Sequence, residues 1–543
     1  MFGLMQDRPL LISSLVTHAA LNHGRREIIS RTLSGDIHRS SYGEVIRRAG
    51  QLAHAMARLG ISPGDVVGSL AWNGYRHLEI YYSISSMGAV LNTINPRLFE
   101  EQLTYIINHA ENKYLFVDLS FVKMLENIRD QIPAVKGFIL LASADEMPDT
   151  SLPDAICYEE LIAGEPESYD WPEFDENTAA VLCYTSGTTG DPKGVLYSHR
   201  STILHTFSLT QQEVFDIGGR DSILPVVPMF HVSAWGLPYA GAMTGAKLVF
   251  PGDDAGGENI LNLIESEGCT KVLGVPTVWL GLLDHVKSLP SRDYTGLPLK
   301  HFLIGGSAVP RSMLEELERS FGATVLQVWG MTEMSPIGTV AHLLPEHEGL
   351  SDDEKMARKL TQGRVAFGID IKIIDEDGQE LPRDGESFGR LMVRGPWITK
   401  GYFRRDDVTV LDEDGWFDTG DVSTIDPDGY MTIVDRSKDV IKSGGEWISS
   451  IDLENAAVGH PDISEAAVIG LPHSKWQERP LLICVAVPGK SPTRQEVLDY
   501  LSDRIVKWWM PDEVEFIDEM PHTATGKIQK MQLRAMFRGR TLG

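Results

Sequence analysis

The sequence predicts an α/β protein: a large N-terminal domain of parallel βαβ sheets plus a β-rich subdomain, followed by a small mobile α+β C-terminal domain. Three observations support this. Short apolar runs alternate with helical patterns over roughly the first 430 residues, and Asp-Gly turn signals become frequent after Ile371. After Arg436 about 105 residues show a β/α pattern of their own, which is enough for a small domain. At 543 residues the chain is also too long for one ordinary core.

The apolar runs of the N-terminal region predict buried strands. They cover residues 113–118, 137–141, 179–183, 271–275, 301–304 and 324–328. Helix-length patterns separate most of them, which is typical of parallel βαβ units. Ligands of such sheets bind at loops that leave the carboxyl ends of strands. The loops after residues 183 and 328 are therefore the first places to look for a site.

The rest of the chain gives the expected domain limits. Turn signals at 375–378, 383–385, 412–415 and 426–429 predict hairpins in a β-rich subdomain of about 365–435. In the tail, Thr493 and Glu496 form a capping-box pattern at the start of an amphipathic helix. We expect an N-terminal domain at 1–435, a connecting segment at 436–440 and a C-terminal domain at 441–543.

Charge and cysteine usage restrict the partners. The chain has 49 basic and 76 acidic side chains, a formal net charge of −27, so nucleic acid and anionic membranes are not expected partners. Its four cysteines are far apart and show no CxxC spacing, which predicts free thiols in a reducing cytoplasm rather than a zinc site. The N-terminus lacks the pattern of a secretion signal.

Residues 222–246 contain no Asp, Glu, Lys or Arg, and this length would permit a membrane span. Pro225, Pro228 and Pro238 argue against a continuous apolar helix. We expect no integral membrane segment here, and the stretch is either plain core or the lining of an apolar tunnel.

The most informative motif is residues 184–194, Tyr-Thr-Ser-Gly-Thr-Thr-Gly-Asp-Pro-Lys-Gly, which follow a predicted strand. Glycines let backbone N–H groups form an anion nest, and the hydroxyls and Lys193 add donors and charge. The motif predicts a polyphosphate-binding loop rather than an ordinary polar turn. It lacks the Gly-Lys-Ser/Thr of a Walker A loop, so a P-loop NTPase is disfavoured.

Five motifs in order resemble those of the adenylate-forming superfamily, which includes acyl-CoA synthetases, adenylation domains and firefly-type luciferases. They are residues 184–194, 329–333, 415–421, 435–439 and 525–527. Residues 225–235, 442–449 and 508–512 look most similar to bacterial medium- or long-chain fatty acyl-CoA synthetases and to 3-methylthiopropionate-CoA ligases. The resemblance implies an ATP-dependent acid:CoA ligase that forms an acyl-adenylate and releases pyrophosphate and AMP. It also implies that 1–435 is the ATP- and acyl-binding domain, that 436–440 is a hinge and that 441–543 is a mobile domain.

The resemblance also implies site residues for ATP, with Mg²⁺ as the metal. Lys527 would bridge the carboxylate and the α-phosphate, Glu333 would bind the metal, and Thr332 would contact the α-phosphate. Trp329 stands where the family commonly has a tyrosine that stacks on adenine. The full nucleotide set is Thr185, Ser186, Gly187, Thr188, Thr189, Gly190, Lys193, Trp329, Gly330, Met331, Thr332, Asp421 and Arg436.

For the other two substrates, the acid and CoA, the implied residues lie elsewhere. The acyl site would include His231, Trp235, Gly305 and Gly306, and the hinge residue would be Lys438. The CoA channel would include Lys442, Gly444 and Gly445. Relatives of this kind are homodimers, so we expect a homodimer.

The acid itself stays open between two classes. A medium-chain fatty acid is the first expectation and 3-methylthiopropionate the alternative, since no motif distinguishes a thioether from a methylene. A luciferase-like monooxygenase or a non-catalytic nucleotide-binding paralogue would use the same core. A serine hydrolase is disfavoured because residues 305–309, Gly-Gly-Ser-Ala-Val, fail the Gly-x-Ser-x-Gly pattern.

Overall fold

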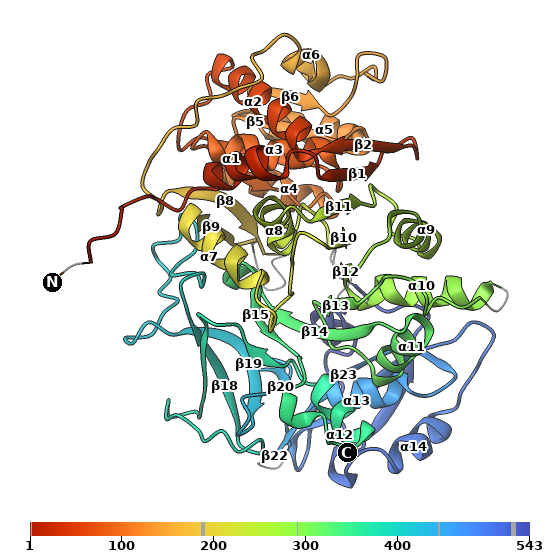
Figure 1. Cartoon of the computed structure of the whole chain (residues 1–543). Coiled ribbons are helices and arrows are strands. Elements are labelled where there is room, and N and C mark those ends of the chain that lie inside the picture. Colours follow the sequence, from red (N-terminus) through yellow and green to blue (C-terminus); the bar gives the residue numbers. More distant parts are fainter. Residues whose placement is uncertain (2, 186–190, 290–291, 444–445, 523–527) are drawn as a thin grey trace.

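A computed structural model describes the chain except for residues 2, 186–190, 290–291, 444–445 and 523–527. The described residues form four β-sheets with helices packed on them (Figure 1). In Figure 1 the first 160 or so residues, coloured red to orange, form one end of the molecule, and the blue C-terminal residues form the other.

The seven-stranded sheet belongs to the N-terminal part of the chain. Its strand order is β7-β6-β5-β3-β4-β8-β9, and every neighbouring pair is parallel except β8 and β9. The strands are β3 (Val66–Leu70), β4 (Val90–Thr93), β5 (Tyr114–Val117), β6 (Gly137–Leu140), β7 (Ala155–Cys157), β8 (Ala179–Tyr184) and β9 (Gly194–Ser198). The helices that precede or connect them are α2 (Tyr42–Arg58), α3 (Tyr75–Ser86), α4 (Glu100–His109), η1 (Leu119–Phe121), α5 (Val122–Ile128), η2 (Arg129–Gln131) and α6 (Tyr158–Ile162).

The nine-stranded sheet has the order β16-β15-β14-β13-β12-β10-β11-β1-β2. Its strands are β1 (Glu27–Arg31), β2 (Ile37–Ser41), β10 (Ser222–Pro225), β11 (Lys247–Phe250), β12 (Lys271–Gly274), β13 (His301–Gly305), β14 (Thr324–Gly330), β15 (Ile337–Val340) and β16 (Arg364–Val365). The associated helices are α1 (Ile12–His23), α7 (His199–Leu209), η3 (Val232–Gly236), α8 (Leu237–Thr244), α9 (Gly257–Glu267), α10 (Pro276–Ser288), α11 (Arg311–Phe321), η4 (Thr332–Met334), η5 (Pro345–His347) and α12 (Asp352–Lys359).

The expected parallel sheets are confirmed in their centres, but their edges are antiparallel. The pairs β1/β2, β14/β15, β15/β16 and β8/β9 all run antiparallel. Parallel neighbours need a crossover of a dozen or more residues, and the loop between β8 and β9 is shorter than that. The loop predicted to bind phosphate therefore closes a hairpin.

The predicted β-rich subdomain is a four-stranded antiparallel sheet. It consists of β17 (Asp370–Ile374), β18 (Phe388–Arg394), β19 (Phe417–Ile425) and β20 (Met431–Arg436). Its turns use the acidic residues that the sequence singled out: the Asp375 carboxylate accepts hydrogen bonds from the backbone N–H groups of Asp377 and Gln379. An aspartate that binds its own backbone in this way stabilises a tight turn.

The C-terminal residues form a five-stranded sheet with separate apolar clusters of their own. The strands are β21 (Ile441–Ser443), β22 (Glu446–Ile448), β23 (Ile463–His473), β24 (Gln477–Ala486) and β25 (Glu513–Phe516), and the helices are α13 (Ser450–Val458), α14 (Arg494–Ser502), η6 (Lys507–Trp509) and α15 (Lys530–Met536). The predicted capping box is confirmed, because Thr493 and Glu496 exchange side-chain-to-backbone hydrogen bonds at the start of α14.

The uncharged stretch 222–246 forms β10, η3 and α8, and nearly all of it is buried. The expected burial inside the protein is thus confirmed. Across the described ranges, no helix is both long enough and apolar enough to span a bilayer. All four cysteines are buried free thiols.

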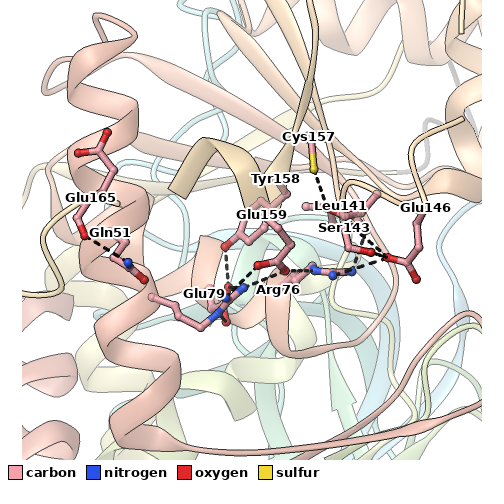
Figure 2. Close-up of polar contacts among 12 residues, drawn as sticks. Gln51, Arg76, Glu79, Leu141, Ser143, Glu146, Cys157, Tyr158, Glu159 and Glu165 are labelled. Atoms are coloured by element: carbon pink, nitrogen blue, oxygen red, sulfur yellow. Dashed lines mark hydrogen bonds and ion pairs between the residues drawn. The ribbon is translucent and has the colours of Figure 1, made fainter. Parts of the chain in front are cut away.

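A buried ion network connects α2, α3 and the start of α6. Arg48 forms ion pairs with Glu79 at 2.6 Å and with Glu159 at 3.0 Å, and Arg76 forms one with Glu159 at 2.8 Å. The Tyr158 hydroxyl donates to Glu79 at 2.6 Å. Figure 2 shows the side chains of Glu79, Arg76, Tyr158 and Glu159 converging on one point. The network fixes α3, whose next turn contacts the predicted acyl-binding segment.

Candidate active site

The site predicted from the sequence lies where three sheets meet. The loop after β8, the segment after β14 and the strands β19 and β20 all reach this region. The described ends of the phosphate-binding loop are tied together, since Thr185 N donates to the Lys193 carbonyl at 2.9 Å and Lys193 N donates to Thr185 Oγ1 at 3.2 Å. The predicted residues Ser186, Gly187, Thr188, Thr189 and Gly190 lie outside the described residues.

Trp329, Asp421 and Arg436 come together from three strands. The Trp329 indole N–H donates to Asp421 Oδ2 at 3.1 Å, and the Arg436 guanidinium lies 2.9 Å from Asp421 Oδ1. Asp421 is 1% exposed, so these partners compensate a buried charge. A carboxylate has about four lone-pair directions, a geometry that suits the two hydroxyls of a diol. The structure thus groups three residues that the sequence assigned separately to the adenosine.

Glu333 and Lys193 are joined by a residue that the sequence analysis missed. The Tyr402 hydroxyl donates to Glu333 Oε1 at 2.8 Å, and the Lys193 ammonium lies 4.9 Å from the centre of the Tyr402 ring. Burial and the neighbouring Glu333 carboxylate raise the pKa of Tyr402, so its phenol stays protonated and can donate. Tyr402 is 69 residues from Glu333 in sequence, and no motif marks it.

The backbone around Glu333 is also fixed by a tyrosine. The Tyr197 hydroxyl donates to the Thr332 carbonyl at 2.6 Å, which links β9 to η4. Met331 N donates to the Pro336 carbonyl at 3.1 Å, and a Cβ on Gly330 would collide with the same carbonyl oxygen. Gly330 is therefore needed for close packing of the backbone.

Metal binding at Glu333 fits the residues present. Among the described residues no group of three His, Cys, Asp or Glu side chains is arranged to bind a metal ion. Mg²⁺, however, is usually bound by one or two carboxylates together with substrate phosphates. Tyr402 donates to one oxygen of Glu333, and a single carboxylate of this kind is chemically suited to an ion that substrate phosphates also bind.

The acyl segment has an unexpected backbone conformation. Val232, Ser233, Ala234 and Trp235 have φ values of 39°, 41°, 53° and 54°, and Gly236 continues the turn at 77°. The left-handed conformation costs an L-residue roughly 1–2 kcal/mol each, or about 4–8 kcal/mol for the four. Neighbouring interactions must offset this strain.

Side chains from the seven-stranded-sheet region hold the segments before and after this turn. The Asn73 amide donates to the carbonyls of Pro225 and Val227, both at 2.8 Å, and accepts from Met229 N at 2.7 Å. On α3, the Tyr81 hydroxyl donates to the Met229 carbonyl and the Tyr82 hydroxyl to the Pro238 carbonyl. Asn73 and both tyrosines are buried and flank the turn on both sides. No local sequence signal marks these three residues, which lie about 150 residues away from their partners along the chain.

The predicted acyl-site residues pack closely. A Cβ on Gly305 would lie 2.8 Å from the Val328 carbonyl oxygen and 3.0 Å from the Trp235 ring. Gly306 has φ +93°, which glycine adopts readily. His231 precedes the left-handed turn with an extended backbone. The structure therefore brings Trp235 against Gly305, and their role in binding an acyl group stays a prediction.

The predicted C-terminal residues are described only in part. Lys438 lies in the turn between β20 and β21, and its carbonyl accepts from Arg534 at 3.5 Å. The Lys442 ammonium pairs with Glu376 of the β-rich sheet at 3.1 Å. Lys527, Gly444 and Gly445 lie outside the described residues.

Comparisons with known proteins agree with this geometry. The sequence profile of the AMP-binding enzyme family matches residues 16–403, and that of the AMP-binding enzyme C-terminal domain matches residues 452–527. The chain is 50% identical, over all of both chains, to 3-methylmercaptopropionyl-CoA ligase from Ruegeria lacuscaerulensis. It is 49% identical to medium-chain-fatty-acid–CoA ligase from Ectopseudomonas oleovorans, covering 99% of this chain and 98% of that one. The structure of ATP-bound MatB from Rhodopseudomonas palustris superposes with a TM-score of 0.82 at 26% identity, covering 98% of this chain and 99% of the other.

Proposed function

The chain belongs to the AMP-binding enzyme family, and we infer from this membership and from its relatives that it is an AMP-forming acid:CoA ligase. Such an enzyme joins a carboxylic acid to CoA at the expense of ATP. The observation that supports this best is that Trp329, near the carboxyl end of β14, donates to the buried Asp421 of β19, while Glu333 lies just after the same end of β14. Carboxyl ends of strands are where sheets of this kind bind ligands.

For the first half-reaction we propose that one group of residues binds the adenosine of ATP and another group binds its phosphates. Asp421 and Arg436 would bind the ribose hydroxyls, and Trp329 would contact the adenine. Thr185, Lys193 and the loop between them would bind the β- and γ-phosphates, and Thr332 the α-phosphate. These roles suit the residues, because a buried carboxylate accepts from a diol and a glycine-rich loop donates to anions.

The acid needs no general base in this step. A carboxylate is already ionised at neutral pH, so it can attack the α-phosphorus directly once two anions are held together. We propose that Lys527 bridges the carboxylate and the α-phosphate and that Glu333, oriented by Tyr402, binds Mg²⁺. The ion would neutralise part of the phosphate charge.

For the second half-reaction we propose that residues 441–543 move about Lys438 and exchange Lys527 for the residues around Gly444 and Gly445. CoA thiolate would then displace AMP. Lys442 would serve this second arrangement, in exchange for its present partner Glu376. A domain movement of this kind separates two reactions in one pocket.

The acid is proposed to be unbranched and apolar, either a medium-chain alkanoate or a methylthioalkanoate. Supporting this, the segment 229–236 has no acidic residue that would bind a substrate ammonium group. The near-equal identity to a 3-methylmercaptopropionyl-CoA ligase and a medium-chain ligase does not favour either acid. We further propose a homodimer that works in the cytoplasm, where buried free thiols stay reduced.

Pyrophosphate release with ATP, Mg²⁺ and a series of acids, with and without CoA, tests this function. Lys527→Ala should abolish acid-dependent pyrophosphate release while thioester formation from supplied acyl-adenylate continues. Equal loss of both half-reactions would contradict the proposed role of Lys527. Activity restricted to aromatic or amino acids would contradict the proposed substrate class.

A further inference from the structure

The loop between β3 and α3 holds the segment that leads into the predicted acyl site. Residues 71–74 follow the carboxyl end of β3 in the seven-stranded sheet, whereas residues 225–230 begin at the end of β10 in the nine-stranded sheet. The Trp72 ring lies edge-on to the Phe230 ring, with the ring centres 5.7 Å apart. The loop therefore joins the two large sheets just before the turn that contains Trp235.

Asn73 uses both ends of its amide group in this contact. Its amide nitrogen donates to the carbonyls of Pro225 and Val227, both at 2.8 Å, and its amide oxygen accepts from Met229 N at 2.7 Å. Two carbonyls and one N–H allow only one orientation of the amide, because only its nitrogen can donate. Asn73 is 3% exposed, so bulk water cannot replace these bonds.

The chemical requirement at this position is narrow. The three bonds go to alternate residues, so one side chain fixes the backbone over residues 225–229. An aspartate has nearly the size of an asparagine, but when ionised it has no donor, and an oxygen would face the two carbonyls. Buried carbonyl groups that lose their donor destabilise the arrangement that contains them. The path of this segment therefore depends directly on Asn73.

Met229 is held at both of its backbone groups. Asn73 binds its N–H, and the Tyr81 hydroxyl donates to its carbonyl. Tyr81 is fully buried and lies on α3, the helix that begins directly after the loop. His231, which follows Met229 by two residues, and Trp235 are the predicted acyl residues of this segment. A shift of Met229 would therefore move one wall of the predicted acyl site.

We propose that Asn73 is a positioning residue of the acyl site, which holds residues 225–229 on one path and thereby sets how sharply the enzyme discriminates between acids of different length. The inference rests on the proposed function and deepens it, because it names a residue that governs acid selectivity without belonging to the predicted acyl set. When the segment can take other paths, the walls of the site are less well defined and discrimination falls.

The test measures kcat/KM, as CoA thioester formation, for straight-chain acids from butanoate to dodecanoate and for 3-methylthiopropionate. The readout is the ratio between the best and the poorest acid of the wild type. In Asn73→Asp this ratio should fall about 3- to 10-fold, as expected when part of the difference in binding between two acids is lost. KM for ATP should change less than about 2-fold, since the residues assigned to ATP keep their contacts. The ratio does not depend on the fraction of active enzyme, so a loss of stability alone leaves it unchanged.

Tyr81→Phe is a second variant, which does not require that Asn73→Asp folds. It keeps the buried ring and removes only the hydroxyl that donates to the Met229 carbonyl. Because the three bonds of Asn73 remain, the ratio should fall in the same direction by a smaller factor.

Asn112→Asp is the matched control. Asn112 is fully buried, its amide nitrogen donates to the Ile107 carbonyl, and its amide oxygen accepts from Asn92, both at 3.3 Å. It precedes β5, which pairs parallel with β3, so it lies at the opposite edge of the same sheet from Asn73. The control should lose stability and keep the wild-type ratio.

Three results would overturn the proposal. They are a wild-type ratio near one, an equal fall of the ratio in Asn112→Asp, and an unchanged ratio in folded Asn73→Asp, or in Tyr81→Phe where Asn73→Asp does not fold. If no acid supports thioester formation in the wild type, the proposed function itself is wrong, and the two failures are thereby distinguished.

Discussion

Replacing Tyr402 by phenylalanine tests the cluster that joins Glu333 to the phosphate-binding loop. The variant keeps the aromatic ring and therefore the cation–π contact with Lys193, which lies 4.9 Å from the ring centre. It removes only the hydroxyl that donates to Glu333 Oε1 at 2.8 Å. Any change in activity then reports on the orientation and charge of the Glu333 carboxylate.

The size of the effect follows from the type of bond. A hydrogen bond to a charged group contributes about 1.5–3 kcal/mol. If the carboxylate is oriented by this bond in the transition state, its loss lowers the adenylation rate about 10- to 150-fold. The half-saturating Mg²⁺ concentration should rise as well, because a carboxylate without its donor is less well oriented toward the metal.

The assay is acid-dependent pyrophosphate release over a range of Mg²⁺ concentrations, alongside thioester formation from supplied acyl-adenylate. Tyr402→Ala, which also removes the ring beside Lys193, should lose more than Tyr402→Phe. Tyr430→Phe is the control, since Tyr430 also donates a phenol hydrogen bond, but to the His342 carbonyl. Wild-type rates and an unchanged Mg²⁺ dependence in Tyr402→Phe would refute the reasoning.

Three further predictions concern packing, buried charge and pH. Gly305→Ala places a Cβ 2.8 Å from the Val328 carbonyl oxygen and 3.0 Å from the Trp235 ring, and such overpacking costs about 1–3 kcal/mol. In initial-rate measurements, kcat/KM for the acid should fall by a larger factor than the factor by which KM for ATP changes. Glu79→Ala should lower the free energy of unfolding by about 3 kcal/mol, measured by denaturant unfolding. This is the low end for breaking a buried ion pair, because Arg48 still pairs with Glu159. A loss below about 1 kcal/mol would contradict the prediction. Burial lowers the pKa of His199 to about 4, below its unfolded value, so the unfolded chain binds the proton first and stability falls as pH drops below about 6.5. At pH 5 the protonation of His199 in the unfolded chain lowers the free energy of unfolding by about 2 kcal/mol. His199→Asn can still accept from Ile12 N, so it should remove this part of the difference in unfolding free energy between pH 7 and pH 5.

Much of the fold could be predicted because its signals are local. The apolar runs at 271–275 and 301–304 became β12 and β13 almost residue for residue, since a buried parallel strand needs a continuous apolar stretch. The edges were less predictable. Nothing local to β14 and β15 determines that they pair antiparallel, because that depends on the short connection and on what covers the edge.

The residues of the candidate site also fall into two groups, those that a local sequence motif marks and those that no motif marks. Asp421 and Glu333 lie in motifs with recognisable composition, so the sequence analysis found them. Tyr402 and Asn73 act through side chains that reach segments far away along the chain, and an isolated tyrosine or asparagine has many ordinary reasons to be present. Only the folded arrangement shows their contacts.

The left-handed turn was not predictable because Val-Ser-Ala-Trp contains no residue that favours positive φ. The segments before and after it are held from outside, by Asn73, Tyr81 and Tyr82. One consequence concerns how selectivity can diverge in such an enzyme. Because these distant residues bind backbone groups outside the turn, a side chain within the turn can be exchanged without removing any of those hydrogen bonds. A lineage could therefore move from one acid to another by single replacements within the turn, while the scaffold around it stays under a separate constraint.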